Sequence, residues 1–172
     1  MNTIAITVTL ALEEQNPEDA YLDFLLTIDG QYIHDSQNHW VDPVDLAASA
    51  ASAGEFFIFT CNCGDPTCVG IDEGVFVSHA QDTVTWRVRN PLGWMPGEEL
   101  PEWTHEVEYS FPREEYIRVV GGALSQAKTL VHYWRAPGRI WVGPDLDVEE
   151  LLSLEIPGGF EVAGESDSRI VH

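Results

Sequence analysis

Basic residues are scarce in this chain, and the scarcity is uneven. Lysine occurs once, at Lys128, and the first basic residue of either kind is Arg87. Residues 1–86 contain 14 aspartates and glutamates and no base, and the net charge of the whole chain is −21. A surface of this charge repels nucleic acid phosphates and anionic lipids, so we expect it to bind neither directly. It attracts basic proteins and speeds their encounter.

Other features that the sequence lacks narrow the class of protein further. No run of apolar residues is long enough to predict a membrane span. The N-terminal residues lack the basic start and the small-residue cleavage site of a signal peptide, which predicts a cytoplasmic protein. We find no nucleophile elbow, phosphate-binding loop, dinucleotide fingerprint, zinc-protease motif or calcium loop. An enzyme is therefore the less favoured class.

The acidity has two open interpretations. In the first, the chain is a non-catalytic interaction module that binds and neutralises or regulates a basic protein, as immunity proteins do. In the second, the acidity is a habit of the host, such as adaptation to high salt, and coats the surface evenly. The sequence specifies no oligomeric state. The first interpretation expects aspartates of the base-free half to gather around one apolar anchor. The candidate partner-binding residues are Asp23, Asp29, Asp35, Trp40, Asp42 and Asp45.

The hydrophobic pattern predicts an α+β fold, in which a mostly antiparallel sheet packs against one long helix in the C-terminal half, with short helices besides. Apolar residues at i, i+3, i+4 and i+7 predict the long helix over 112–134, with Val120 and Leu124 on its buried face. We expect a single domain at 1–160 and a flexible tail at 161–172. Alternating residues predict strands at 3–12, 21–28, 31–34, 55–60, 74–79, 83–89 and 104–111.

Local signals indicate where several elements begin and end. Asp29-Gly30 predicts a tight hairpin turn. Asp42 is expected to cap a short helix that begins at Pro43. Asp147-Val148-Glu149-Glu150 resembles a capping box at the start of another short helix. The stretch 90–101 is rich in proline and glycine, and we expect it to form a mobile loop or a lid.

All three cysteines lie within eight residues, at Cys61, Cys63 and Cys68. Thiolates this close together predict a zinc site. Cys61 and Cys63 can both bind one metal ion only if the backbone bends there, and Gly64 permits such a bend. Zinc takes four ligands, and we expect His79, at the end of the following strand, to be the fourth.

The fourth ligand and the state of the cysteines leave alternatives open. His105 is the second choice as ligand, and Asp65 and Asp72 are further candidates. Water as the fourth ligand would make the protein a small zinc-dependent enzyme built on the cysteine cluster. In two other interpretations no metal is bound: the cysteines are free thiols in a tight turn, or two of them form a disulfide or redox pair.

The cysteine segment also resembles a motif of a family of uncharacterised bacterial proteins. The motif is F-x-T-C-x-C-G-x-x-x-C-x-G-I followed by V-x-W, and the resemblance is carried by Phe57 to Ile71, with Ile58 at the phenylalanine position of the motif, and by Val84-Thr85-Trp86. The acidic N-terminal part and the helix start from Phe111 to Tyr116 also look similar. The resemblance implies no established activity. Some proteins of this kind look like immunity or interaction proteins, which favours an interaction module by analogy.

Overall fold

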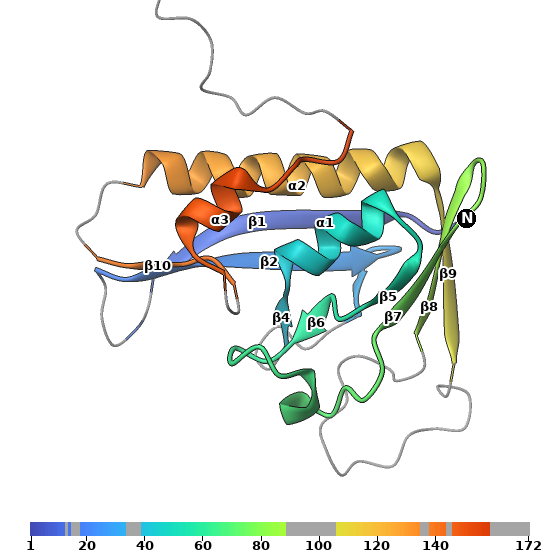
Figure 1. Ribbon diagram of the computed structural model, residues 1–172, viewed down its shortest axis with the longest axis horizontal. Helices are drawn as coiled ribbons and strands as arrows, with labels where there is room; N and C mark the ends of the chain where they lie inside the picture. The colour runs from blue at the N-terminus through green and yellow to red at the C-terminus, as the bar shows by residue number, and fades with distance from the viewer. Residues whose placement is uncertain are drawn as a thin grey trace, which may run out of the picture.

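The chain folds into mixed layers of helix and antiparallel strand, which confirms the predicted α+β class (Figure 1). The computed structural model describes residues 1–12, 14, 18–33, 39–88, 106–134, 138–143 and 146–158. The predicted tail at 161–172 and the predicted loop or lid at 90–101 lie outside these residues. The strands are β1 (Ile4–Leu12), β2 (Ala20–Ile28), β3 (Gln31–Tyr32), β4 (Trp40–Val41), β5 (Gly54–Phe56), β6 (Phe59–Thr60), β7 (Val75–His79), β8 (Thr83–Val88), β9 (Val107–Pro112) and β10 (Ile140–Trp141). The helices are α1 (Pro43–Ala51), the 3-10 helix η1 (Pro66–Val69), α2 (Arg113–Tyr133) and α3 (Val148–Ser153).

The first sheet is built on a long antiparallel ladder between β1 and β2. The turn after β2 is the predicted one, and Asp29 and Gly30 both adopt positive φ, at 52° and 77°. Along β2 every second side chain is buried, and the residues between them are half-buried on the other face. β10 pairs with β2 in parallel, with Trp141 opposite Tyr21. β10 was not predicted from the sequence, because two residues are too few to show an alternating pattern.

The remaining strands form two further sheets, ordered β5-β7-β8-β9 and β4-β6. The prediction of a single strand over 55–60 is wrong, because this segment leaves one sheet and enters another. The Phe57 amide donates to Asp45 Oδ2 over 2.6 Å, and the Asp42 amide donates to the Ile58 carbonyl over 2.8 Å. These bonds hold the chain to the start of α1, so that β5 pairs with β7 and β6 pairs with β4.

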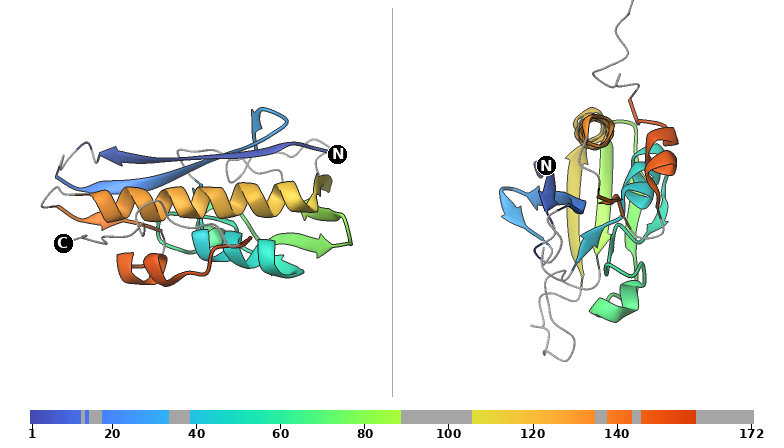
Figure 2. Two further views of the ribbon diagram at one scale, coloured as in Figure 1. Left: turned by 90° about the horizontal axis from the view of Figure 1, so that it is seen from above. Right: turned by 90° about the vertical axis from the view of Figure 1, so that its left-hand side faces the viewer.

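The helices begin where the local signals indicated. The Asp42 carboxylate accepts hydrogen bonds from the amides of Val44 and Asp45 and caps α1. Asp147 and Glu150 form the reciprocal capping box of α3. α2 runs the length of the β1–β2 ladder and lies between it and the side that carries α1 and α3 (Figure 2). None of the helices in the described residues is long and apolar enough to cross a membrane.

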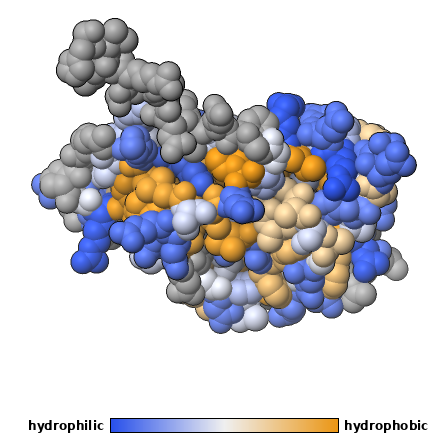
Figure 3. All heavy atoms as spheres, turned by 45° about the horizontal axis from the view of Figure 1, so that its top comes forward, coloured by the Kyte–Doolittle hydropathy of each residue, from blue (hydrophilic) through white to orange (hydrophobic). Residues whose placement is uncertain are grey.

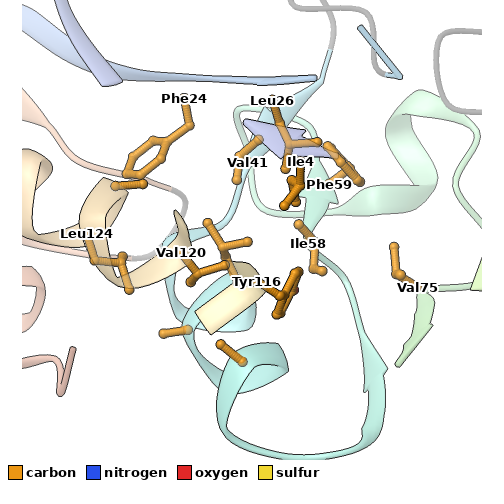
Figure 4. Packing of buried hydrophobic residues seen from close by; sticks show 14 of the residues in the cluster. Ile4, Phe24, Leu26, Val41, Ile58, Phe59, Val75, Tyr116, Val120 and Leu124 are labelled. Carbon is orange, nitrogen blue, oxygen red and sulfur yellow. The ribbon is translucent and has the colours of Figure 1, made fainter. Parts of the chain in front are cut away.

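The core lies under α2 and joins all the layers. Val120 and Leu124 are fully buried, which confirms the predicted inner face of the helix. Figure 4 shows these two side chains and Tyr116 pointing toward apolar side chains from β1, β2, β4 and the β6 segment. Because residues from so many strands meet one face of α2, the position of this helix determines how the sheets are held together.

A buried polar chain at the centre ties α1 and α2 to the second sheet. Trp86 Nε1 donates to the Tyr116 hydroxyl over 3.1 Å, and that hydroxyl lies 2.7 Å from Ser49 Oγ. Ser49 Oγ in turn donates to the Leu46 carbonyl. Burial raises the pKa of Tyr116, so the phenol stays neutral and can donate. Each polar side chain of this network of Trp86, Tyr116 and Ser49 thus has a hydrogen-bond partner within the protein.

Apolar surface remains exposed around α1 and the segment after α3. A groove there is lined by alanines of α1, by Ile117 of α2, and by Leu154 and Ile156. On the upper face of the molecule, hydrophobic residues gather between hydrophilic ones (Figure 3).

Candidate metal centre and adjoining pocket

The fold brings the three cysteines together in one turn at the molecular surface. β6 delivers Cys61 to the turn, and the Gly64 amide donates to the Cys61 carbonyl over 3.1 Å. Gly64 has φ of 84°, a conformation that costs a residue with a side chain more than it costs glycine. η1 then returns the chain, so that the sulfurs of Cys61, Cys63 and Cys68 all lie within 4.8 Å of one another.

The sulfurs of Cys63 and Cys68 have a spacing that suits a metal site. In a tetrahedral zinc thiolate site with bonds of about 2.3 Å, the sulfurs lie about 3.8 Å apart. Cys63 Sγ and Cys68 Sγ are 3.6 Å apart, and both residues are exposed. Cys61 is buried, and its sulfur accepts a hydrogen bond from the Cys63 amide over 3.2 Å. The three cysteines can therefore bind a metal ion from a partly exposed position.

The structure also shows an alternative state of the same sulfurs. Cys61 and Cys63 are joined as a disulfide, and Cys68 is a free thiol beside them. A disulfide sulfur is not a thiolate ligand, so metal binding requires this bond to be reduced. The two states of the cluster therefore exclude each other, and the redox environment selects between them.

His79, expected as the fourth ligand, does not join this group. It ends β7, whereas the cysteine turn precedes the start of that strand, so the length of β7 separates them. Its Nε2 lies 2.9 Å from the Ser49 carbonyl of α1 instead. His105 lies outside the described residues, and Asp72 is not in the group either. Among the described residues, the cluster thus offers three protein ligands.

Asp65 has a structural role in the cysteine turn. Its carboxylate caps η1 by accepting hydrogen bonds from Thr67 Oγ1 over 2.7 Å and from the Thr67 amide over 2.9 Å. These bonds, the side-chain one foremost, hold the pKa of Asp65 below its usual range. The ionised carboxylate therefore orders the segment that carries Cys68.

Three of the candidate partner-binding aspartates are used to hold the fold. Asp29 accepts hydrogen bonds from Asn2 Nδ2 and the Thr3 amide at the end of β2, and these bonds lower its pKa. Asp42 and Asp45 fix the start of α1, as described above. Asp29 is also about 20 Å from Asp23 along the direction of β2. The aspartates in the described residues therefore do not gather on one surface as expected. Asp35 lies outside the described residues.

Asp23 and Trp40, by contrast, both lie next to Tyr21. The Trp40 ring packs on Tyr21 with centroids 5.2 Å apart. Tyr21 and Asp23 share the half-exposed face of β2, because side chains two residues apart on a strand point the same way. Trp141, opposite Tyr21 in the register, is 51% exposed. The rings of Tyr21, Trp40 and Trp141 line a pocket of about 470 Å³ beside the cysteine turn, and Asp23 lies outside its lining. Its lining includes Asp19, Tyr21, Trp40, Asn62, Arg139 and Trp141.

This pocket was not predicted from the sequence. Trp141 follows Ile140 in a short apolar run, a pattern that fits a core residue as well as an exposed one. The pocket depends on β10 and β4, each of two residues, and on their pairing with distant strands. Pairings of this kind leave no periodic trace in a single sequence.

The charge of the described surface is more one-sided than the composition alone implies. No acidic residue in the part of the chain that the structure describes is buried. Lys128, the only lysine, is buried instead, and its ammonium donates to the carbonyl oxygens of Leu152 and Leu154 at the end of α3. Its positive charge therefore compensates helix carbonyls rather than surface carboxylates.

The fold and the site together define an acidic α+β protein with a three-cysteine cluster at its surface and an aromatic pocket beside it. The chain matches no family model, no curated protein and no solved structure. The likeness of the cysteine segment to a bacterial motif therefore stays a prediction.

Proposed function

We propose that this protein is an acidic, non-catalytic interaction module of the cytoplasm that binds a basic protein partner, as immunity and regulatory proteins do. We further propose that zinc held by Cys61, Cys63 and Cys68 stabilises it. The observation that carries the proposal is an aromatic surface on which Trp40, from the half of the chain that has no lysine or arginine, and the exposed Trp141 line one pocket. Exposed tryptophan in an acidic setting is typical of residues that dominate protein–protein binding.

The electrostatics support association rather than folding. A net charge of −21 works against the compact state by self-repulsion. It speeds the encounter with an oppositely charged protein. The burial of Lys128 leaves the described surface poorer still in positive charge. Zinc is the proposed metal because the three ligands would be soft thiolates. The cytoplasm is the proposed compartment because zinc binding needs these cysteines to be reduced.

The test is an affinity capture from the native host, followed by association kinetics with the captured partner at increasing salt. We expect a basic partner whose association rate falls as salt rises, because exposed charges are screened over about 8 Å at physiological ionic strength. Asp23→Asn should slow association more than it speeds dissociation. The matched control is Asp82→Asn, the same change in charge at the exposed turn between β7 and β8.

A denaturation series against salt separates this proposal from adaptation of the host to salt. An interaction module keeps its stability at low salt. Marked loss of stability below about 0.5 M salt, with no basic partner recovered, would mean that the acidic surface is an adaptation to a salty solvent, and would contradict the proposal.

Replacement of Asp23 by asparagine and replacement of Asp29 by asparagine should change the melting temperature in opposite directions. Burial raises the pKa of Asp23, so its ionised form opposes folding at neutral pH. Asp23→Asn should therefore raise the melting temperature at pH 7, and the gain should shrink as pH falls through the folded-state pKa. Hydrogen bonds lower the pKa of Asp29, so Asp29→Asn should lower the melting temperature, with a loss that disappears at low pH. Thermal melts from pH 7 to pH 3 measure both, and equal signs would contradict the assigned roles.

A second candidate function rests on the fourth metal position. Three thiolates with no fourth ligand among the described residues leave room for a water that zinc would activate. A small zinc-dependent enzyme that uses the cysteine cluster would have this arrangement. The interaction module remains the better supported function, because Asp65, the carboxylate of the cysteine turn, already accepts the Thr67 hydrogen bonds.

A further inference from the structure

The pocket beside the cysteine turn combines aromatic rings with carboxylates, and we propose that it binds an arginine side chain of the basic partner. This inference rests on the proposed function and names the chemical group of the partner that the pocket recognises. The rings come from three separate strands, Tyr21 from β2, Trp40 from β4 and Trp141 from β10. The site therefore exists only in the folded chain.

The rings are arranged to receive a planar cation. Tyr21 and Trp40 are tilted by 53° at 5.2 Å, so they form a corner rather than a closed stack. Trp141, half exposed, stands at the position next to Tyr21. A guanidinium stacks on aromatic faces and is more weakly hydrated than an ammonium, so it gives up less on entering such a corner. The protein itself contains such a pair, with the Arg87 guanidinium carbon 5.3 Å from the Phe76 ring centroid.

Charge favours a cation in this pocket over a neutral group. Asp19 lines it, and Asp23 lies one strand repeat beyond Tyr21 on the same face. Arg139 lines the pocket as well, so the lining itself has one carboxylate and one guanidinium, and the excess negative charge comes from Asp23 outside the lining. Burial raises the pKa of Asp23, and a cation placed nearby would favour its ionised form again. An arginine in the pocket therefore stabilises the ionised form of the Asp23 carboxylate and also stacks on the rings.

The apolar groove between α1 and the segment after α3 lacks these features. The described residues that line it are alanines and aliphatic side chains of α1, α2 and the segment after α3, with Glu155 as their acid. It contains no aromatic ring among those residues, so it offers a cation no stacking surface. The aromatic pocket thus offers a cation more than this groove does.

The first experiment needs only the protein itself. The probe is N-acetyl-arginine amide, titrated while the tryptophan indole N–H signals are followed by NMR at constant ionic strength. We expect shifts of the Trp40 and Trp141 signals, with the buried Trp86 unaffected. The matched control is N-acetyl-citrulline amide, which has nearly the same shape and no charge. Equal shifts with both probes, or none with either, would overturn the proposal.

Variants identify the groups that bind the probe. Trp141→Ala should weaken binding about threefold to thirtyfold, the range expected for a lost cation–π contact. Asp23→Asn, which keeps every ring in place, should weaken it as well. Tyr133→Ala removes an aromatic ring of similar exposure, 57%, from α2, and should leave the affinity unchanged. An unchanged affinity of the Trp141→Ala protein would contradict the assignment even if the Asp23 variant behaves as expected.

The same variants separate this inference from the proposed function. A basic partner whose affinity is unaffected by Trp141→Ala would support the function and overturn the arginine pocket. Probe binding that depends on Trp141, without any basic partner from the host, would support a guanidinium site and contradict the proposed function.

Discussion

Leu124→Ala is expected to lower the free energy of unfolding by about 2–5 kcal/mol, the range measured for removal of a buried leucine side chain. Leu124 has no exposed surface and lies at the centre of the face that α2 turns toward the sheets. The cost has two parts, the lost burial of the removed carbons and the cavity that the surrounding side chains cannot fill. Urea or thermal denaturation of the two proteins measures it.

Leu152→Ala is the matched control, because it removes the same atoms from a leucine that is 41% exposed on α3. We expect a change within about 0.5 kcal/mol, as for most surface substitutions. Similar losses at both positions would mean that α2 is not the element that holds the layers together.

The second large effect concerns the metal. Protein purified under reducing conditions should carry about one zinc per chain, and Cys63→Ser should abolish this binding and lower the melting temperature. Zinc contributes about 10 kcal/mol or more in small domains that fold only with the metal. A smaller loss is expected here, because this chain has a core of its own. Free zinc at about 1,000 times its dissociation constant would add about 4 kcal/mol. Elemental analysis and thermal melts with and without a chelator measure both effects.

Asn62→Ser is the control for this substitution, since it changes the same turn and keeps every sulfur. Thiol titration then distinguishes the states of the cluster. Metal-free reduced protein should show the thiols of Cys61, Cys63 and Cys68, whereas the disulfide state should show Cys68 alone. Reduced protein that takes up no zinc and melts at the same temperature with or without the metal would rule out the metal centre.

The elements that were predicted correctly are those whose signals are local. The long helix was recognisable because its apolar residues recur over several turns, and Asp42 and Asp147 were recognisable because a cap is a contact within a few residues. The proximity of the cysteines is local in the same sense, since Gly64 and η1 lie between them. The break at Phe57 was missed, because the bond to Asp45 that causes it joins residues in different elements.

The sequence by itself thus determined the α+β class, the buried face of α2, the acidic charge and the meeting of three sulfurs, since each depends on periodicity, composition or short spacing. Tertiary structure alone decided that His79 binds the Ser49 carbonyl, that Lys128 is buried, and that the rings around Tyr21 form a pocket. These features depend on which distant strands pair, and strands as short as β4 and β10 are stabilised by the core around them rather than by their own residues.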